Sequence, residues 1–326
     1  MSDFEITRFV IVGAGAIGGS VAGLFHQANV PFAVVARGTH GETIRRDGLS
    51  LNLFDQYLSV PVHCVSTLAE LDWQVGDVAV IATKLNDVPE VLVQLERFTS
   101  SSVPVVCLTN GIHAESWAAE KFETVISTLV WMPATHLKPG QVELYSGSLR
   151  GVLDSGPVKG DPDQTISNQL CQAFVLAGFE AVARQDILDW KYAKLISNLG
   201  GAAQACVSDD WHSVAEAARE EGVNVLKQAG VASVDLEVLL DRCSQVELKE
   251  IEGVSRQGGS TWQSRKRGRP LETPWIEGAI VELADQFGIE APVNRALLKV
   301  AMNPRDVLAK EILGLGKEKS HEANAP

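Results

Sequence analysis

The 326-residue sequence has few cysteines, little positive charge and no long hydrophobic segment. Its five cysteines stand singly, and its seven histidines show no spacing of the HExxH kind, so we predict neither a disulfide framework nor a metal site. No run approaches the roughly 18 consecutive apolar residues of a membrane helix, and no signal-like segment opens the chain. We therefore expect a cytoplasmic protein.

The shortage of positive charge limits the partners. Twenty-eight basic residues face 41 acidic ones, and the resulting net charge of -13 disfavours binding to nucleic acid or to an anionic membrane. A small anionic ligand could still be held by a local cluster of cations. The densest cluster is the basic run 265–269, which we expect to be a solvated loop or a source of positive potential for such a ligand.

The two halves of the chain have different hydrophobic patterns. In the first half, short apolar runs alternate with helical stretches, which is typical of a parallel sheet covered on both faces. After about residue 181 the pattern is helical, and we predict helices at 186–206, 214–229, 236–251, 274–287 and 293–302. The prediction is an α/β domain at 1–183, an all-α domain at 184–313 and a disordered tail at 314–326.

A glycine-rich turn follows the first predicted strand, at residues 9–12. Gly13 and Gly15 allow a tight turn and a close approach to a pyrophosphate, and Gly18 lets the following helix pack on the strand. Ala16 and Ile17 begin that helix, whose N-terminus would face the anion. The alternative is an ordinary glycine-rich turn, but the strand and helix around it favour a dinucleotide site.

Arg37 follows the second predicted strand, where NAD-binding proteins usually place an acidic residue. A guanidinium can pair bidentately with a 2′-phosphate, so this position favours NADP(H) over NAD(H). A solvated loop cation is the alternative.

With these motifs, the chain from about Arg8 to Met302 resembles the ketopantoate reductase (2-dehydropantoate 2-reductase) family. The resemblance implies a Rossmann-like N-terminal domain, a helical C-terminal domain and an active site in the cleft between them. It also implies NADPH-dependent reduction of a 2-oxo acid in pantothenate biosynthesis, and a homodimer. The matching stretches are Gly13-Ala14-Gly15-Ala16-Ile17-Gly18-Gly19, Ala82-Thr83-Lys84, Thr109-Asn110-Gly111, Trp190-Lys191-Tyr192-Ala193-Lys194-Leu195 with Asn198, and Gly268-Arg269-Pro270-Leu271-Glu272-Thr273.

The resemblance also assigns roles to the catalytic residues. Lys194 would be the general acid that protonates the developing alkoxide, with Glu272 as its orienting partner. Asn198 lies four residues after Lys194, on the same flank of the predicted helix. A lysine at the edge of a core loses hydration, which lowers its pKa and suits it to donate a proton. The alternatives are a lysine on a solvated face and, for Glu272, a helix N-terminal acid.

Four more positions bind ligands in this interpretation. By resemblance Asn198 and Ser260 contact the substrate, Asn110 contacts the substrate or the nicotinamide ribose, and Lys84 lies near the cofactor. Asn110 and Lys84 each follow a predicted strand, at the sheet edge where open α/β sheets place ligands. Each could instead be an ordinary turn or surface residue.

The sequence departs from the family pattern at three positions. Ala202 stands where a second pocket asparagine is common, Pro274 replaces an aspartate and Glu277 replaces an asparagine. Because an amide missing from a pocket changes which substrates it accepts, another 2-oxo acid or an alcohol is an alternative to ketopantoate. A non-catalytic NADP(H) sensor and oxidation of a 2-hydroxy acid also stay open.

Overall fold

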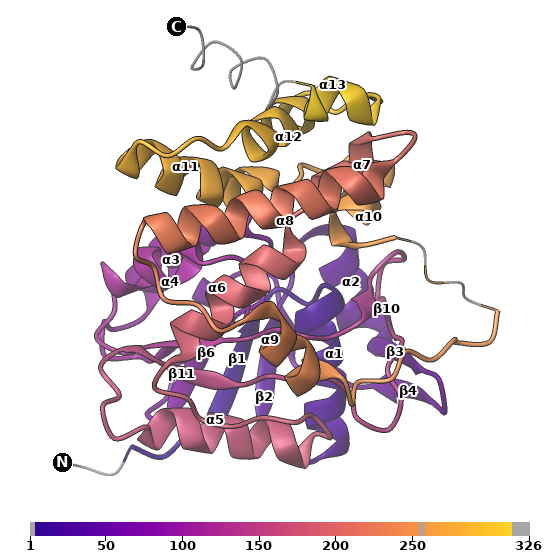
Figure 1. The fold of residues 1–326 in the computed structure, drawn as a ribbon. Helices are drawn as coiled ribbons and strands as arrows, with labels where there is room; N and C mark the ends of the chain where they lie inside the picture. The colour runs from indigo at the N-terminus through magenta and orange to yellow at the C-terminus, as the bar shows by residue number, and fades with distance from the viewer. Residues whose placement is uncertain (1–3, 254–255, 257, 315–326) are drawn as a thin grey trace, which may run out of the picture. The chain divides into compact units, whose positions relative to one another are not determined.

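The structure, a computed structural model, describes residues 4–253, 256 and 258–314. The chain forms two compact units: Met1–Trp190 with Glu237–Arg256, and Lys191–Leu236 with Gln257–Pro326. The first contains a parallel sheet with helices and the second is helical, which confirms the predicted fold class (Figure 1). The predicted disordered tail, apart from Gly314, lies outside the described residues.

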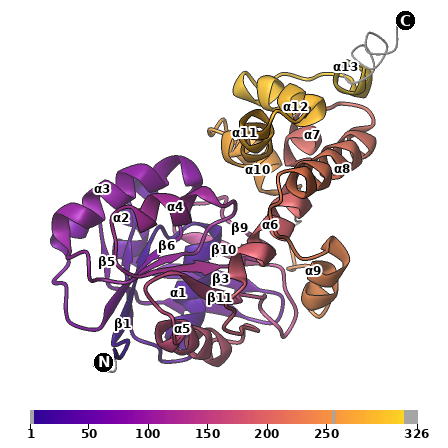
Figure 2. The ribbon, with the colours of Figure 1, turned by 60° about the vertical axis from the view of Figure 1, so that its left-hand side comes forward.

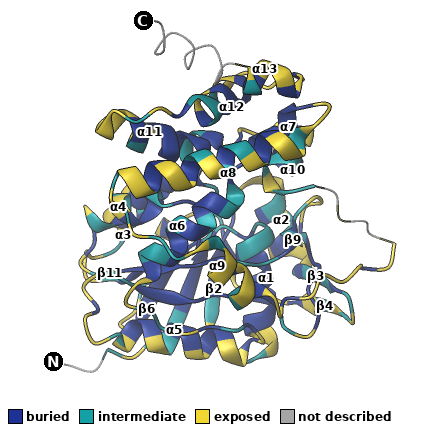
Figure 3. Cartoon of the chain, in the orientation of Figure 1, coloured by how far each residue is buried: buried dark blue, intermediate teal, exposed yellow. Residues whose placement is uncertain are grey.

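The first unit is built on a seven-stranded sheet in the part of the chain that the structure describes. Its strands pair in parallel except the strand at Ser155–Lys159, which is antiparallel to its neighbour, and they are almost wholly buried (dark blue in Figure 3). Continuous Val, Ile and Ala runs form such strands because both faces of the sheet are covered. The strands, in spatial order, are β11 (Ser155–Lys159), β8 (Val125–Thr128), β7 (Val105–Cys107), β6 (Asp77–Ile81), β1 (Arg8–Val12), β2 (Phe32–Val35) and β5 (Cys64–Val65).

Helices cover both faces of this sheet. Helices α1 and α5 lie on one face, and α3 and α4 lie on the other (Figure 2). The helices and 3-10 turns of the unit are α1 (Ala16–Gln27), α2 (Gly38–Asp47), η1 (Leu68–Glu70), η2 (Leu85–Asp87), α3 (Val88–Phe98), α4 (His113–Ala119), α5 (Thr165–Leu176) and α9 (Leu236–Cys243).

A second, four-stranded sheet packs on α1. A Cβ at Gly19 would lie 2.7 Å from Val142, and one at Gly23 would lie 2.7 Å from Leu51, so these glycines let the helix approach the sheet closely. The sheet therefore holds the helix that follows the glycine-rich turn from the side opposite β1. Its strands, in spatial order, are β4 (Tyr57–Val60), β3 (Leu49–Leu53), β10 (Gln141–Leu144) and β9 (Ala134–Thr135).

The second unit is a bundle of helices around α8. Glu221 of α8 accepts hydrogen bonds from the backbone N–H groups of Val293 (2.9 Å) and Asn294 (2.8 Å), which caps the first turn of α12. The elements are α6 (Ile187–Asn198), which begins in the first unit, α7 (Gly201–Cys206), α8 (Trp211–Gln228), α10 (Ser260–Lys266), η3 (Thr273–Trp275), α11 (Glu277–Phe287), α12 (Pro292–Met302) and α13 (Ala309–Leu313).

The division between the units differs from the predicted boundary at residue 183. It lies at Trp190, and the segment 237–256 returns to the first unit. The reason is a buried carboxylate: Asp154 is 0% exposed and pairs with Arg184 and Arg242, each at 2.7 Å. Arg184 also lies over the ring of Trp190, at 3.9 Å from its centroid. An ionised group at this depth requires its partners, so both arginines stay with the sheet domain.

Two of the predicted helices are shorter in the structure. The one predicted at 236–251 ends at Cys243, after which Gly147 donates to Glu247 (2.9 Å) and Lys249 to Tyr145 (2.8 Å) through backbone bonds. The one predicted at 186–206 is interrupted at Gly200, where φ is +93°. Among the described residues, no helix is both long enough and apolar enough to cross a membrane.

Candidate active site

A candidate nucleotide site lies at the carboxyl ends of four neighbouring strands of the first unit. Gly13 follows β1, Arg37 follows β2, and Lys84 and Asn110 follow β6 and β7 after short linkers. The chain order reverses at β1, because β2 lies on one side of it and β6 on the other. Open α/β sheets bind ligands at such a switch point.

The glycine-rich turn has the shape that a pyrophosphate requires. Gly13 adopts φ +101°, and a Cβ there would lie 2.8 Å from Thr83. A Cβ on Gly18 would lie 2.0 Å from the carbonyl oxygen of Gly13, so the helix packs on the strand only without one. At Gly15 a Cβ would meet open space, which leaves room for a ligand at the start of α1. Ala16 and Ile17 form the first turn of that helix.

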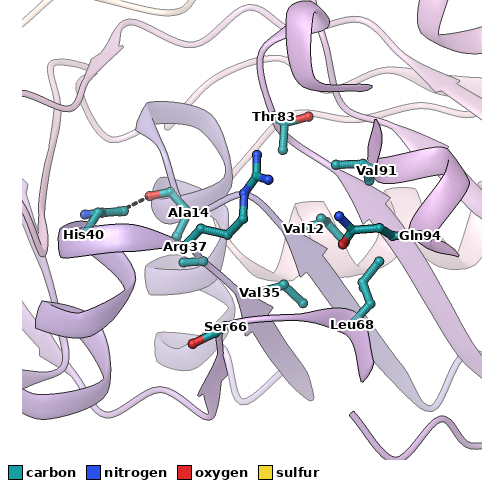
Figure 4. Close-up of a pocket in the computed structure, with 12 residues that line it drawn as sticks. Val12, Ala14, Val35, Arg37, His40, Ser66, Leu68, Thr83, Val91 and Gln94 are labelled. Carbon is teal, nitrogen blue, oxygen red and sulfur yellow. Dashed lines mark hydrogen bonds between the residues drawn. The ribbon is translucent and has the colours of Figure 1, made fainter. Parts of the chain in front are cut away.

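A pocket of about 100 Å³ lies beside the turn (Figure 4). Its lining includes Ala14, Arg37, Thr83 and Gln94, and the side chain of Arg37 extends toward Thr83. Arg37 is exposed and pairs with Glu90 of α3 at 3.0 Å, and its terminal nitrogen lies 3.7 Å from Asp87. Arg37, the residue predicted to contact a 2′-phosphate, therefore lies at the pocket. Its guanidinium also interacts with the carboxylates of Glu90 and Asp87.

His40, which sequence reasoning did not assign, also lines this pocket. Its Nδ1 accepts the N–H of Gly140 at 2.8 Å, so Nε2 carries the proton and donates to the carbonyl of Ala14 at 2.7 Å. Burial lowers the pKa of His40 below its usual 6.5, although the bond to Ala14 opposes the shift. A neutral histidine thus links the glycine-rich turn to the loop before β10.

The second unit carries the predicted proton donor. Lys194 and Asn198 lie one turn apart near the end of α6, and both are half-buried. The ammonium of Lys194 donates to the side-chain carbonyl of Asn198 at 3.0 Å. The spacing that predicted their proximity therefore produces a direct hydrogen bond, which fixes the direction of the ammonium group.

The other predicted residues of this half lie on neighbouring elements of the same unit. Ser260 is exposed at the first position of α10, and Glu272 is 8% exposed directly before η3. The basic run matches the prediction of a solvated loop only in part: residues 266–269 are exposed, but Arg265 lies in α10, donates to the carbonyl of Ala205 and pairs with Asp306 at 2.9 Å. Its charge therefore ties α10 to other parts of the unit.

Two of the three positions that depart from the family pattern lie in contact with each other. The N–H of Ala202 donates to Oε1 of Glu277 at 3.1 Å, and Glu277 is 1% exposed. Burial raises the pKa of Glu277 to about 7, while the backbone bonds oppose the rise. Pro274, the third position, is the second residue of η3. The sequence marked Ala202 and Glu277 as unusual, but nothing in their spacing indicated that they touch.

No group of three or more His, Cys, Asp or Glu side chains with metal-binding geometry occurs among the residues that the structure describes. What these residues can do is bind an anion at a helix N-terminus in the first unit, and hold a directed ammonium beside an amide in the second.

Comparison with known proteins identifies the family of the chain. The family model described as "Ketopantoate reductase PanE/ApbA" matches residues 9–157, and the model of its C-terminal part matches residues 187–304. The chain belongs to the ketopantoate reductase family. Similar curated relatives are the 2-dehydropantoate 2-reductases of Archaeoglobus fulgidus (28% identical, over 91% of this chain and 97% of the relative) and Pyrococcus horikoshii (26%, over 95% and 100%).

Solved structures show the same fold. A PanE/ApbA family ketopantoate reductase from Ralstonia eutropha is 23% identical, with a TM-score of 0.74 over 91% of this chain and 97% of that one. D-mandelate dehydrogenase, solved with NADH and anilino(oxo)acetate, is 22% identical, with a TM-score of 0.76 over 91% and 97%. The resemblance predicted from the motifs is therefore confirmed, and the chain is a member of an oxidoreductase family.

Proposed function

We propose that this ketopantoate reductase family member uses NADPH to reduce the ketone of a small anionic 2-oxo acid to a 2-hydroxy acid, with 2-dehydropantoate as the first candidate substrate. The observation that carries the proposal is the hydrogen bond from Lys194 to Asn198, which directs a proton donor within the second unit. The glycine-rich turn at the switch point of the first unit supports the cofactor half. The names of the curated relatives support the choice of substrate.

The residues present divide the chemistry between them. A bound nicotinamide dinucleotide supplies a hydride to the ketone carbon, which leaves negative charge developing on the oxygen. Lys194 donates a proton to that oxygen, and its bond to Asn198 keeps the ammonium in one orientation. A cation that is already held in position stabilises the developing negative charge without any reorganisation of the site. Glu272, Ser260 and Asn110 are proposed to anchor the substrate or orient the lysine.

Replacing Lys194 tests this mechanism. Lys194→Ala should lower kcat with the best 2-oxo acid by roughly 10²- to 10⁴-fold, because general acid catalysis contributes about that much. Lys227→Ala, at an exposed position of α8 in the same unit, is the control and should leave turnover unchanged. An undiminished rate in Lys194→Ala removes this residue from the chemistry.

A screen of 2-oxo acids for NADPH oxidation tests the function itself. Turnover of 2-dehydropantoate above all others supports the first candidate, and preference for another acid moves the substrate within the same reaction. Turnover of no acid or hydroxy acid would favour a dinucleotide sensor instead.

We also propose that the protein is a homodimer. The molar mass measured by light scattering tests this proposal.

The preference for NADPH rests on Arg37, and one observation favours NADH as a second candidate. In the structure Arg37 pairs with Glu90 and lies near Asp87, so a 2′-phosphate must compete with two carboxylates for the same guanidinium. Exposed pairs of this kind are worth about 0.2–1 kcal/mol each, whereas a charge-assisted bidentate bond is stronger. We therefore expect NADPH to bind more tightly than NADH, but with a modest ratio.

Dissociation constants decide between the two cofactors. The ratio Kd(NADH)/Kd(NADPH) should exceed one in the parent, fall toward one in Arg37→Ala and rise a few-fold in Glu90→Gln, which removes one competing charge. Equal dissociation constants in the parent would overturn the argument from the 2′-phosphate. Glu42→Gln, at an exposed position of α2 outside the lining of the pocket, is the control that removes an acidic charge elsewhere.

A further inference from the structure

The short helix α7 is central to the candidate substrate residues of the second unit. It begins three residues beyond Asn198, the partner of Lys194, and it lies beside α10, whose first residue is Ser260 (Figure 1). Whatever fixes α7 therefore also fixes where these two side chains stand. The features that hold it are a glycine joint, a glutamine and a buried carboxyl group.

The joint between α6 and α7 depends on Gly200. Its φ of +93° is costly for any residue with a side chain, and a Cβ there would lie 2.3 Å from the Cβ of Ala215 on α8. The turn at Gly200 therefore packs directly against α8, and there is no room for a side chain at this position. It redirects the chain directly after Asn198, so a shift of α7 would move the end of α6 with it.

Contacts with Gly259 and Thr261 connect α7 to the start of α10. The side-chain carbonyl of Gln204, on α7, accepts the N–H of Gly259 at 2.8 Å. A Cβ on Gly201 would lie 2.9 Å from the hydroxyl of Thr261, so the two segments also pack closely. These contacts flank Ser260 on both sides and set its position relative to α7.

The carboxyl group of Glu277, on α11, is the third feature that fixes the position of α7. Its Oε1 accepts the N–H of Ala202 at 3.1 Å, and the backbone of Gly200 also hydrogen-bonds to the carboxyl group. The first N–H groups of a helix lack partners within it, and this carboxyl group satisfies them from inside the protein. Retaining an ionisable group that is 1% exposed costs stability, which a neutral side chain would avoid.

We propose that Glu277 is a positioning residue for the substrate half of the site: by accepting the backbone N–H groups at the start of α7, it sets the placement of Asn198, and through it Lys194, and of Ser260. Only the kinetic consequences of this proposal rest on the proposed function. The effect of Glu277 on the placement of α7 does not depend on it. Glu277 acts through the backbone and takes no part in proton transfer.

The charges around Glu277 determine how the proposal depends on pH. The described titratable group that responds to it is Cys206, at the end of α7, whose thiol pKa is raised first by burial and further by Glu277. Arg265 and Asp306 act on the same thiol with opposite signs. The ionised carboxylate is the better acceptor for the α7 N–H groups, so the hold on α7 should strengthen as Glu277 loses its proton.

Hydrogen–deuterium exchange of the backbone tests the structural content without any assay of activity. In Glu277→Leu, the amides of 200–206 and 258–262 should exchange at least tenfold faster than in the parent, while Glu277→Gln, which keeps an acceptor oxygen, should stay near the parent. Glu282→Gln, at an exposed position of the same helix, is the control. Unchanged protection in Glu277→Leu would overturn the proposal, even for a protein without turnover.

Kinetics test the functional content once a substrate is found. Glu277→Leu should raise KM for the 2-oxo acid roughly tenfold or more, with the dissociation constant of NADPH unchanged, because misplacement by about 1 Å can cost up to 10²-fold. The ratio of kcat/KM between the parent and Glu277→Gln should rise through about pH 7, near the pKa of Glu277. Taking the ratio cancels the other titrating groups.

The outcomes separate the two hypotheses. An inactive parent with the expected exchange pattern refutes the proposed function and leaves the positioning role standing. An active parent in which Glu277→Gln and Glu277→Leu lose equal activity, with no change in pH dependence, refutes the positioning role. Weakened NADPH binding in Glu277→Leu would also refute it, because the effect would then extend beyond the substrate half.

Discussion

Replacing Glu277 by glutamine should change how the stability of the protein depends on pH. The carboxyl group is 1% exposed, and its pKa is raised from 4.5 to about 7 in the folded chain. Between these values the folded state holds a proton that the unfolded chain has already lost. Each increase in pH across this window therefore lowers the free energy of unfolding. Glutamine is neutral throughout and has no such slope.

The expected magnitude follows from the two pKa values. A move from 4.5 to about 7 corresponds to roughly 3 kcal/mol, at about 1.4 kcal/mol for each pH unit. Relative to the parent, Glu277→Gln should therefore gain about that much stability between about pH 4.5 and pH 8. Any difference between the hydrogen bonds of the protonated carboxyl group and those of the amide shifts the whole curve of the variant, but not its dependence on pH.

Urea unfolding at a series of pH values measures this difference directly. The free energies of unfolding of the parent, Glu277→Gln and the exposed control Glu282→Gln are compared at each pH. The reasoning is refuted if the gap between the parent and Glu277→Gln is the same at about pH 5 and about pH 8, since the buried carboxyl would then titrate as it does in water. A matching slope in Glu282→Gln would refute it as well.

Three further substitutions test other parts of the structure. Arg242→Ala leaves the carboxylate of Asp154 with one fewer cation, and should lower the free energy of unfolding by about 3 kcal/mol in urea titrations. His40→Gln should remove a loss of stability that the parent shows as pH falls below 6.5, because the lowered pKa keeps His40 neutral in the folded state; thermal unfolding at several pH values measures it. Gly18→Ala places a Cβ 2.0 Å from the carbonyl of Gly13, and should weaken NADPH binding at least tenfold by calorimetry.

Each of these substitutions has its own contradicting result. A change below about 1 kcal/mol in Arg242→Ala would mean that the pair behaves like a surface ion pair. Parallel pH curves for the parent and His40→Gln would show that His40 does not need to be neutral. Undiminished NADPH affinity in Gly18→Ala would mean that the dinucleotide does not use this turn.

The parts of the site that could be predicted from sequence depend on short-range patterns. The turn from Gly13 to Gly18 has a fixed spacing between a strand and a helix, and Lys194 and Asn198 lie one helical turn apart. Both patterns are local, so tertiary packing could not easily override them. Their placement at a strand end and on one helix followed directly from the residue order.

What the sequence did not reveal depends on contacts between distant residues. The apolar spacing of Leu199 and Ala202 continues across Gly200, so one long helix was the natural prediction, and the break follows from the contact with Ala215. Glu277 was visible as unusual, but its burial depends on α7, 75 residues earlier in the chain. The return of α9 to the first unit likewise depends on a partner that no local pattern reveals.

That return has a consequence for how the protein is made. Arg242 follows Asp154 by 88 residues, so at 5–20 residues per second a ribosome needs roughly ten seconds to deliver it after the carboxylate has been synthesised. During this interval the nascent sheet domain cannot bury Asp154 with both of its cations. The N-terminal half should therefore complete its fold only after the first segment of the helical unit, residues 191–236, has been translated, although its sheet is already encoded by the first 160 residues.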